Sequence, residues 1–152
     1  MSQVGQTEAK PLIRAAKRER MDPPPIWFMR QAGRHLPEFR KLRETRGFLE
    51  ICYNPALAVE ATMQPVRRYG VDGAVIFSDI LVVPHGLGVP LDFAPGPKLR
   101  PLNDPVDLAH LSLSRMEAFL ESSYQAMAEL RAALARERPA TAAIGFCGAP
   151  FT

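Results

Sequence analysis

Charged side chains stand at the ends of two apolar segments of this chain. Arg30 directly follows the apolar residues 26–29, with Arg34 four positions later, and Asp79 interrupts the apolar run 73–83. An unpaired charge at the end of a buried segment is strongly unfavourable, so each group needs an opposite charge or a polar ligand. Either Arg30 and Asp79 pair with each other, or the guanidinium groups hold a polycarboxylate whose cationic or NH-rich part faces Asp79.

Basic residues are concentrated in one stretch of the chain. Between residues 30 and 46, six Arg and Lys side chains stand against two Glu, whereas the net charge of the whole chain is only +3. Guanidinium suits the oxygens of carboxylates and phosphates, so a small polyanion is the expected partner. For Arg40, Lys41 and Arg46 we favour a solvated helical face. A nucleic-acid partner is disfavoured because acidic residues interrupt the stretch and stacking aromatic residues are not interleaved with it.

The composition is that of an ordinary globular domain. The chain has 152 residues, of which 47% are hydrophobic and 23% are charged. We expect a cytoplasmic protein without a membrane partner, because no apolar run is long enough to span a bilayer and residues 1–20 contain no apolar signal core. Cys52 and Cys147 lie far apart without a CxxC motif, so we expect two buried thiols and neither a disulfide nor a metal site.

Apolar runs and helical periodicity alternate along the chain, which predicts an α/β fold. We expect strands at 26–29, 73–83 and 142–147. We expect helices at 37–51, at 55–69 with a kink or break at Pro65, and from a capping box at Ser114 to about residue 136. The proline-rich residues 84–105 predict a long loop. Three strands make a parallel sheet with right-handed crossovers, whose ligands bind at the carboxyl ends of the strands. No strand is followed by a dinucleotide or P-loop glycine motif.

Two motifs at these strand ends resemble hallmarks of the uroporphyrinogen decarboxylase family. They are MRQAGRHLPEFR at residues 29–40 and FSDILVVP at residues 77–84, and QPVRR at 64–68 and GFCGAPFT at 145–152 also agree. The resemblance covers residues 11–152. It implies a TIM (β/α)8 barrel, of which this chain supplies roughly the first three strands with their helices. Residues 1–152 are then the N-terminal part of a single barrel domain, with residues 1–22 as a polar lead-in.

The same resemblance implies a carboxy-lyase. The family decarboxylates the four acetate side chains of uroporphyrinogen III to methyl groups, which yields coproporphyrinogen III in porphyrin (haem and chlorophyll) biosynthesis. It uses neither a metal nor an organic cofactor. The implied partners are the tetrapyrrole substrate and, for the full-length protein, a second copy in a homodimer. Family members are more than twice as long as this chain, so we expect an N-terminal portion that is inactive by itself.

Catalytic roles carried over from the family fall on Asp79 and Arg30. Decarboxylation is expected to proceed through protonation of the pyrrole ring, and the resemblance implies that Asp79 accepts hydrogen bonds from the pyrrole NH groups and stabilises the resulting cation. Arg30 and Arg34 are implied to hold substrate carboxylates. Arg30 is also a candidate proton donor, although arginine is a poor acid and a proton relayed from a bound water is an equal alternative.

The remaining implied substrate-binding residues are neighbours of these groups. Gln31, Ala32 and Gly33 are implied to shape the turn between the two arginines. Phe77 is implied to pack against the macrocycle, although as a sequence feature alone it indicates a core residue. Arg43 either lies near the site, as in the family, or belongs to the surface.

Two rival functions remain open at this point. A corrinoid-type methyltransferase related to the decarboxylases would need zinc and a thiol or corrinoid substrate, and the MRQAGR motif disfavours it. A non-catalytic tetrapyrrole-binding fragment is the second rival. His35 stands where the family often carries tyrosine, and we assign it no role.

Overall fold

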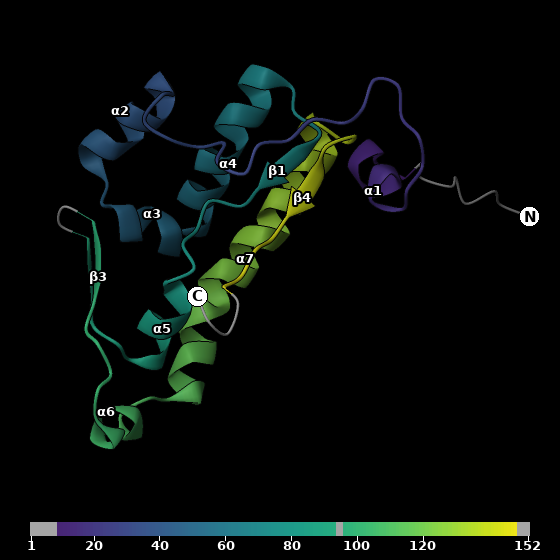
Figure 1. Cartoon of the computed structure of the whole chain (residues 1–152). Helices are drawn as coiled ribbons and strands as arrows, with labels where there is room; N and C mark the ends of the chain where they lie inside the picture. Colours follow the sequence, from purple (N-terminus) through teal and green to yellow (C-terminus); the bar gives the residue numbers. More distant parts are fainter. Residues whose placement is uncertain (1–8, 94–95, 149–152) are drawn as a thin grey trace, which may run out of the picture.

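Two parallel strands and two long helices form the core (Figure 1). The structure is a computed structural model that describes residues 9–93 and 96–148. Strand β1 (Gly73–Val75) pairs in parallel with β4 (Ala142–Ile144), and Ala74 lies opposite Ala143. Helices α4 (Pro55–Tyr69) and α7 (Leu113–Glu137) pack against each other and against these strands. The fold class is therefore mixed α/β, as predicted.

Shorter elements surround this core. Figure 1 shows α1 at one end of the two strands, with the hairpin and α6 beyond the other end. The hairpin is antiparallel. The shorter elements are α1 (Pro11–Ala16), α2 (Pro37–Thr45), α3 (Phe48–Tyr53), α5 (Val82–Leu87), the hairpin strands β2 (Leu91–Phe93) and β3 (Pro97–Leu99), and α6 (Pro105–Ala109).

Local sequence fixes the ends of both long helices. Asn54 caps α4 by accepting a hydrogen bond from the Leu57 N–H at 3.1 Å, and Gly70 ends the helix with φ at 65°, which glycine adopts without strain. The predicted helix 55–69 is confirmed, and it continues through Pro65 without a break. Helix α7 is confirmed too, but the predicted Ser114 cap is wrong. Ser112 is the cap residue and accepts from the Arg115 N–H at 3.2 Å.

Apolar side chains from α4, β1 and α7 make the main core. Its fully buried members include Met63 and Val66 of α4, Ala74 of β1, and Leu130 and Leu134 of α7. A second cluster gathers Leu36, Phe39, Ile51 and Ala61 around the start of α2. Burial of this apolar surface is the main force that holds the helices on the sheet.

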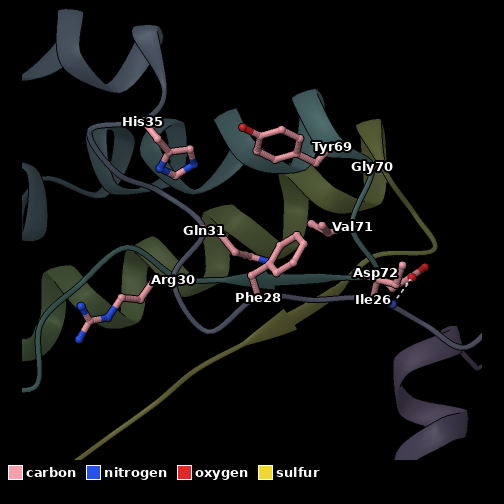
Figure 2. A pocket seen from close by; sticks show the side chains of 9 residues that line it. All are labelled: Ile26, Phe28, Arg30, Gln31, His35, Tyr69, Gly70, Val71 and Asp72. Carbon is pink, nitrogen blue, oxygen red and sulfur yellow. Dashed lines mark hydrogen bonds between the residues drawn. The ribbon is translucent and has the colours of Figure 1, made fainter.

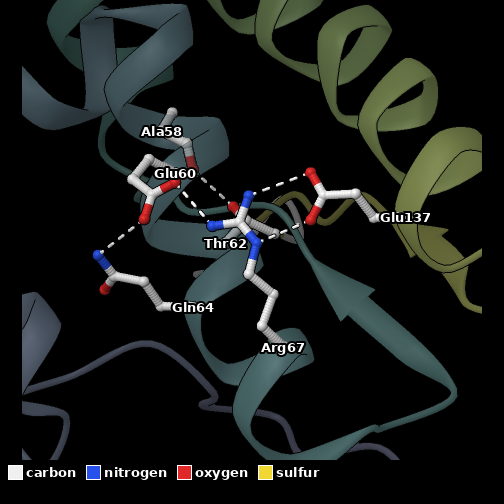
Figure 3. A network of polar contacts seen from close by, with 6 residues as sticks. All are labelled: Ala58, Glu60, Thr62, Gln64, Arg67 and Glu137. Atoms are coloured by element: carbon white, nitrogen blue, oxygen red, sulfur yellow. Dashed lines mark hydrogen bonds and ion pairs between the residues drawn. The ribbon is translucent and has the colours of Figure 1, made fainter.

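Arg67 links the two long helices at the surface of the core (Figure 3). From α4, its guanidinium contacts Glu60 on the same helix at 2.8 Å and Glu137 at the end of α7 at 2.8 Å. A second hydrogen bond of 3.2 Å joins Arg67 to the other carboxylate oxygen of Glu137. This fork is geometrically specific, although the partly exposed side chains limit its strength.

The predicted strand at residues 26–29 is wrong. Its side chains are exposed, up to 79% for Met29, and it makes no ladder with β1. The free edge of β1 is occupied instead by a side chain, because the Gln31 amide hydrogen-bonds to both Gly73 and Val75. Of residues 26–29, only Ile26 hydrogen-bonds to the backbone beside this edge. Its carbonyl accepts from the Asp72 N–H at 2.7 Å.

The other two predicted strands are present but shorter than expected. The first of them was expected at 73–83, whereas β1 ends at Val75. The Asp79 carboxylate accepts a hydrogen bond from the Leu81 N–H at 2.8 Å, and this turn leads the chain into α5. Val82 and Val83, predicted as strand, therefore lie in a helix. The third strand was expected at 142–147, whereas β4 ends at Ile144.

Residues 37–51 and 84–105 also differ from the sequence prediction. The predicted helix 37–51 is divided into α2 and α3, because Arg46 and Gly47 are extended and the Gly47 N–H donates to the Glu50 carboxylate at 3.2 Å to begin a new helix. The predicted loop 84–105 contains the end of α5 and the β2–β3 hairpin. Prolines are compatible with both, since Pro84 lies within α5, Pro90 directly precedes β2 and Pro97 begins β3.

Candidate active site

The carboxyl ends of β1 and β4 meet at a cavity of about 330 Å³. Because the strands are parallel, the segments that follow them, 76–83 and 145–148, leave the sheet at the same edge. Helix α7 supplies another wall. The lining includes Cys52, Phe77, Ser78, Asp79, Ser123, Tyr124, Met127, Phe146 and Cys147. The cavity thus combines a carboxylate with aromatic and aliphatic side chains.

Asp79 is held at this cavity by its own turn. Its Oδ1 accepts from the Leu81 N–H at 2.8 Å, and its backbone carbonyl accepts from the Val82 N–H at 3.2 Å. No ion pair joins Arg30 to Asp79 within residues 9–93 and 96–148. One carboxylate oxygen is therefore fixed by the backbone, and the side chain keeps the capacity to accept hydrogen bonds from a ligand.

Neutral acids lie close to this carboxylate. Burial raises the pKa of the Cys52 thiol to about 12, with a further contribution from the charge of Asp79 and an opposing one from Arg43. Burial also raises the pKa of the Tyr53 hydroxyl to about 12, assisted by Cys52 and Asp79. Both groups are uncharged near pH 7, so they place no second negative charge beside Asp79.

Phe77 belongs both to the core and to the cavity wall. Its ring packs against Phe39 at a centroid distance of 5.3 Å and against Phe48 at 5.5 Å. Its backbone N–H donates to the buried Thr62 hydroxyl at 2.8 Å. These contacts fix the segment that leads to Asp79.

Arg43 approaches this aromatic group from α2. Its guanidinium carbon lies 6.0 Å from the centroid of the Phe48 ring, and its Nη1 donates to the Arg46 carbonyl at 2.7 Å. Arg43 does not line the cavity itself. Arg43 is therefore a half-buried surface arginine one side chain away from Phe77.

The MRQAGR segment lies at a second pocket of about 450 Å³ (Figure 2). Arg30, Gln31 and His35 line it together with Tyr69 and Asp72. Figure 2 shows the Arg30 guanidinium pointing away from the other labelled side chains. Arg30 does not line the cavity that contains Asp79. The described residues therefore do not bring the two predicted catalytic groups into one cavity.

Neighbours of Arg30 are anchored in different ways. Gln31 is 5% exposed and bonds to β1, whereas Arg34 is exposed. Ala32 packs against the second apolar cluster. The Gly33 carbonyl accepts from the Leu36 N–H at 3.0 Å and so closes a turn before α2.

Sequence reasoning missed several groups around the cavity. Thr62, Tyr53 and His85 were not singled out, although a threonine on the apolar face of a helix is a recognisable signal for a buried hydroxyl. The Tyr53 hydroxyl lies 2.8 Å from Nδ1 of His85. Of the two thiols predicted to be buried, Cys52 is buried, but Cys147 is exposed because β4 ends before it.

Within the described part of the chain, no three His, Cys, Asp or Glu side chains are grouped closely enough to hold a metal ion. In the same residues, no helix has the length and apolar character required to cross a bilayer.

Comparison with known proteins decides the family. The family model described as "Uroporphyrinogen decarboxylase (URO-D)" matches residues 7–152, nearly the whole chain. The chain belongs to the uroporphyrinogen decarboxylase family. The match includes the MRQAGR segment, Asp79 and the residues that follow β4.

Curated members of the uroporphyrinogen decarboxylase family are similar along almost all of this chain. A protein named uroporphyrinogen decarboxylase from Rhizorhabdus wittichii is 49% identical over 148 residues, which is 95% of this chain and 42% of that protein. Proteins of the same name from a Chelativorans species and from Gluconacetobacter diazotrophicus are 48% and 46% identical, over 93% and 94% of this chain and 41% and 43% of their own lengths. The chain therefore spans about two fifths of the length of these relatives.

Proposed function

We propose that this chain is the N-terminal part of a uroporphyrinogen decarboxylase, which converts the four acetate arms of uroporphyrinogen III to methyl groups and yields coproporphyrinogen III. The observation that carries the proposal is the match of the family model to residues 7–152, with Asp79 at a cavity beside the carboxyl end of β1. The relatives with this name are similar over more than nine tenths of the chain.

The proposed reaction replaces CO2 with a proton on each acetate arm. Protonation of a pyrrole ring carbon creates a cation, and the electron pair of the C–CO2 bond then flows into the ring as CO2 leaves. A second proton converts the exocyclic carbon into a methyl group, and loss of the first proton restores the pyrrole. One proton is consumed and one CO2 is released for each arm, so the pyrrole ring itself serves as the electron sink.

In this proposal Asp79 stabilises the cationic ring. Its Oδ1 is already oriented by the Leu81 N–H, so the carboxylate does not have to reorganise when charge develops on the substrate. Pyrrole NH groups are hydrogen-bond donors that match its remaining acceptor capacity. Phe77, packed between Phe39 and Phe48, would present a fixed apolar surface to the macrocycle.

Arg30 and Arg34 hold substrate carboxylates in this proposal. Both belong to the segment just before α2, and guanidinium forks are suited to the acetate and propionate groups of the substrate. Arg30 also delivers a proton, either directly or through a water that it binds. Gln31, Ala32 and Gly33 hold the segment between the two arginines, and Arg43 supports the aromatic side of the site through Phe48.

The proposal extends to the architecture of the whole protein. Residues 1–152 form part of one TIM-barrel domain, with residues 1–22 leading into it, and the β1–β4 pair contributes two of the barrel strands. Parallel pairing and the packing of α4 and α7 against the strands support this arrangement. The full-length protein is proposed to act as a cytoplasmic homodimer without a metal or organic cofactor.

Turnover by the intact gene product that contains residues 1–152 tests the proposal. The protein would be incubated anaerobically with uroporphyrinogen III, and the CO2 released and the porphyrins formed after oxidation would be quantified. We expect four CO2 for every coproporphyrinogen formed. Tight binding of uroporphyrinogen without release of CO2 would contradict the proposal and favour a non-catalytic tetrapyrrole-binding protein.

A further inference from the structure

Helix α5 follows the turn that holds Asp79 and contacts two other helices. Figure 1 shows it beside α7, and the two helices pack closely at Gly86, where a Cβ atom would lie 3.4 Å from the Cα of Met116. The Ser112 N–H at the start of α7 donates to the Leu87 carbonyl at 3.0 Å. These contacts with α7 locate the carboxyl-terminal half of α5.

A tyrosine on α3 is the second contact of α5. The Tyr53 hydroxyl lies 2.8 Å from Nδ1 of His85 on α5, and the centroids of the two rings are 5.8 Å apart. Phe119 of α7 packs edge-on against both rings, with its centroid 4.6 Å from that of Tyr53 and 5.1 Å from that of His85. Three helices therefore meet in one aromatic cluster, and a hydrogen bond joins two of its members.

Both partners of this hydrogen bond are uncharged near neutral pH. Burial lowers the pKa of His85 below its ordinary value, and the charge of Arg115 lowers it further. Burial raises the pKa of the Tyr53 hydroxyl to about 12. A neutral imidazole has one nitrogen that accepts a hydrogen bond, so the Tyr53 hydroxyl can donate to Nδ1 when the ring carries its proton on Nε2.

The backbone of His85 leads directly to Asp79. The His85 N–H donates to the Leu81 carbonyl at 3.0 Å. The N–H of Leu81 in turn donates to Oδ1 of Asp79 at 2.8 Å. A displacement of His85 would therefore be passed to the carboxylate through a single residue.

We propose that Tyr53 and His85 are positioning residues, whose hydrogen bond fixes α5 and thereby the orientation of the Asp79 carboxylate at the cavity. Neither side chain lines the cavity, so neither is assigned a contact with the substrate. The inference rests on the proposed function, in which Asp79 stabilises a cationic pyrrole, and deepens it. The contact between α3 and α5 involves no edge of β1 or β4, so it is compatible with the pairing of both strands in a closed barrel.

Variants that remove the hydrogen bond but keep an aromatic ring test this inference in the intact gene product. Tyr53→Phe removes the hydroxyl, and His85→Phe removes Nδ1. His85→Asn is the rescuing variant, because its amide places a polar atom near the position of Nδ1. His110→Phe is the matched control, because His110 is exposed at the end of α6 and does not line the cavity.

Steady-state kinetics with uroporphyrinogen III are the first readout. We expect Tyr53→Phe and His85→Phe to lower kcat by about fivefold and to change KM by less than about twofold, because Asp79 acts on the cation that forms in the transition state. The double variant should lose no more activity than either single variant, because both substitutions break the same contact. His85→Asn and His110→Phe should each keep kcat within about twofold of the wild-type value.

The second readout is the effect of Tyr53→Phe in an Asp79→Asn background. Because Tyr53 acts through the charged carboxylate, its substitution should lower kcat no further once that charge is removed. A loss of stability would instead lower the folded fraction in both backgrounds. Circular dichroism at the assay temperature measures this fraction for each variant.

The outcomes distinguish this inference from the proposed function. A fall in kcat for Tyr53→Phe and His85→Phe, together with no further fall for Tyr53→Phe in the Asp79→Asn background, supports the positioning role. Wild-type kcat in both single variants overturns it, and so does an equal fall in the two backgrounds, while the proposed function stands in either case. Absence of turnover by the wild-type protein overturns the proposed function, and with it the role of this pair in catalysis.

Discussion

The Thr62 hydroxyl joins α4 to the segment that carries Asp79, because its Oγ1 accepts from the Phe77 N–H at 2.8 Å. The same hydroxyl donates to the Ala58 carbonyl at 2.7 Å (Figure 3). Thr62 is completely buried. One side chain therefore fixes the separation between a core helix and the backbone two residues before the candidate catalytic carboxylate.

Removal of this hydroxyl should destabilise the protein. Thr62→Val keeps the shape of the side chain but leaves the Phe77 N–H without its partner, which costs about 1–3 kcal/mol of unfolding free energy. Denaturant unfolding of the intact gene product measures the loss. The exposed Thr45→Val substitution at the end of α2 is the control, with an expected change within about 0.5 kcal/mol. Equal effects of the two substitutions would contradict the role of the Thr62–Phe77 contact.

The Arg67 fork between α4 and α7 should contribute little to stability. Its ion pairs with Glu60 and Glu137 are partly exposed, with 42% of the Arg67 side chain accessible, so Arg67→Met should cost less than about 1 kcal/mol. Arg67 lowers the pKa of the Glu137 carboxyl. The Arg67–Glu137 pair therefore contributes to the free energy of unfolding at neutral pH. This contribution disappears as the pH falls through the lowered pKa of Glu137. Denaturant unfolding at low and high salt tests this, and a large loss that persists at 1 M salt would contradict it.

His85 should make the protein less stable as the pH falls below 7. Burial, with a further contribution from Arg115, lowers the pKa of His85 below its ordinary value of 6.5 in the folded protein. The unfolded chain therefore binds the proton first, so folding loses stability as the pH falls through 6.5 and the loss levels off below the folded pKa. We expect His85→Gln to flatten the change in unfolding free energy between pH 7.5 and 5.5. An unchanged slope in this variant would contradict the prediction.

The two thiols should differ in reactivity. Cys147 is exposed, whereas Cys52 is buried and its pKa is raised to about 12, so thiolate is scarce at Cys52 near neutral pH. We expect iodoacetamide at pH 7.5 to alkylate Cys147 at least about tenfold faster than Cys52 in the folded protein. Peptide mass spectrometry of the alkylated intact gene product measures both rates. Similar rates at the two positions in the folded state would contradict the expected burial of Cys52.

Local signals in the sequence predicted the long helices well. Helix α4 has Asn54 as its cap, Pro55 in its first turn and Gly70 at its end, and each of these signals acts on residues only a few positions away from it. Helix α7 was predicted from the spacing of its apolar residues. Its cap was assigned to Ser114, whereas Ser112, two positions earlier, is the cap residue. Both strands of the parallel pair were also located, but their carboxyl ends were not.

Side-chain contacts with the backbone explain what the sequence could not predict. Apolar residues 26–29 have the composition of a strand, but the Gln31 amide occupies the edge of β1 that they would have paired with. Apolar residues 80–83 also suggest a strand, but the Asp79 carboxylate bonds to the Leu81 N–H and begins a helix. In both cases one polar side chain decides the path of the chain, and periodicity does not report such contacts.

The candidate site was predicted only in part for a related reason. Asp79 was found because a charge interrupts an apolar run, and Phe77 was assigned from the family resemblance; both lie at the cavity. The cavity also needs Cys52 and Ser123 from separate helices, and their meeting depends on tertiary packing. Arg30 was assigned to the same site from its motif, whereas in the described residues it lines a different pocket.

Turnover by Asp79→Asn in the intact gene product tests the central claim most directly. Asparagine keeps an oxygen that can accept from the Leu81 N–H but removes the negative charge that the cationic pyrrole needs, so we expect kcat to fall by about 10²-fold or more with little change in melting temperature. Asp107→Asn is the matched control. It removes the negative charge of a carboxylate on α6 that pairs with Arg100, and the variant should retain activity. Near-normal uroporphyrinogen decarboxylation by Asp79→Asn would contradict the account.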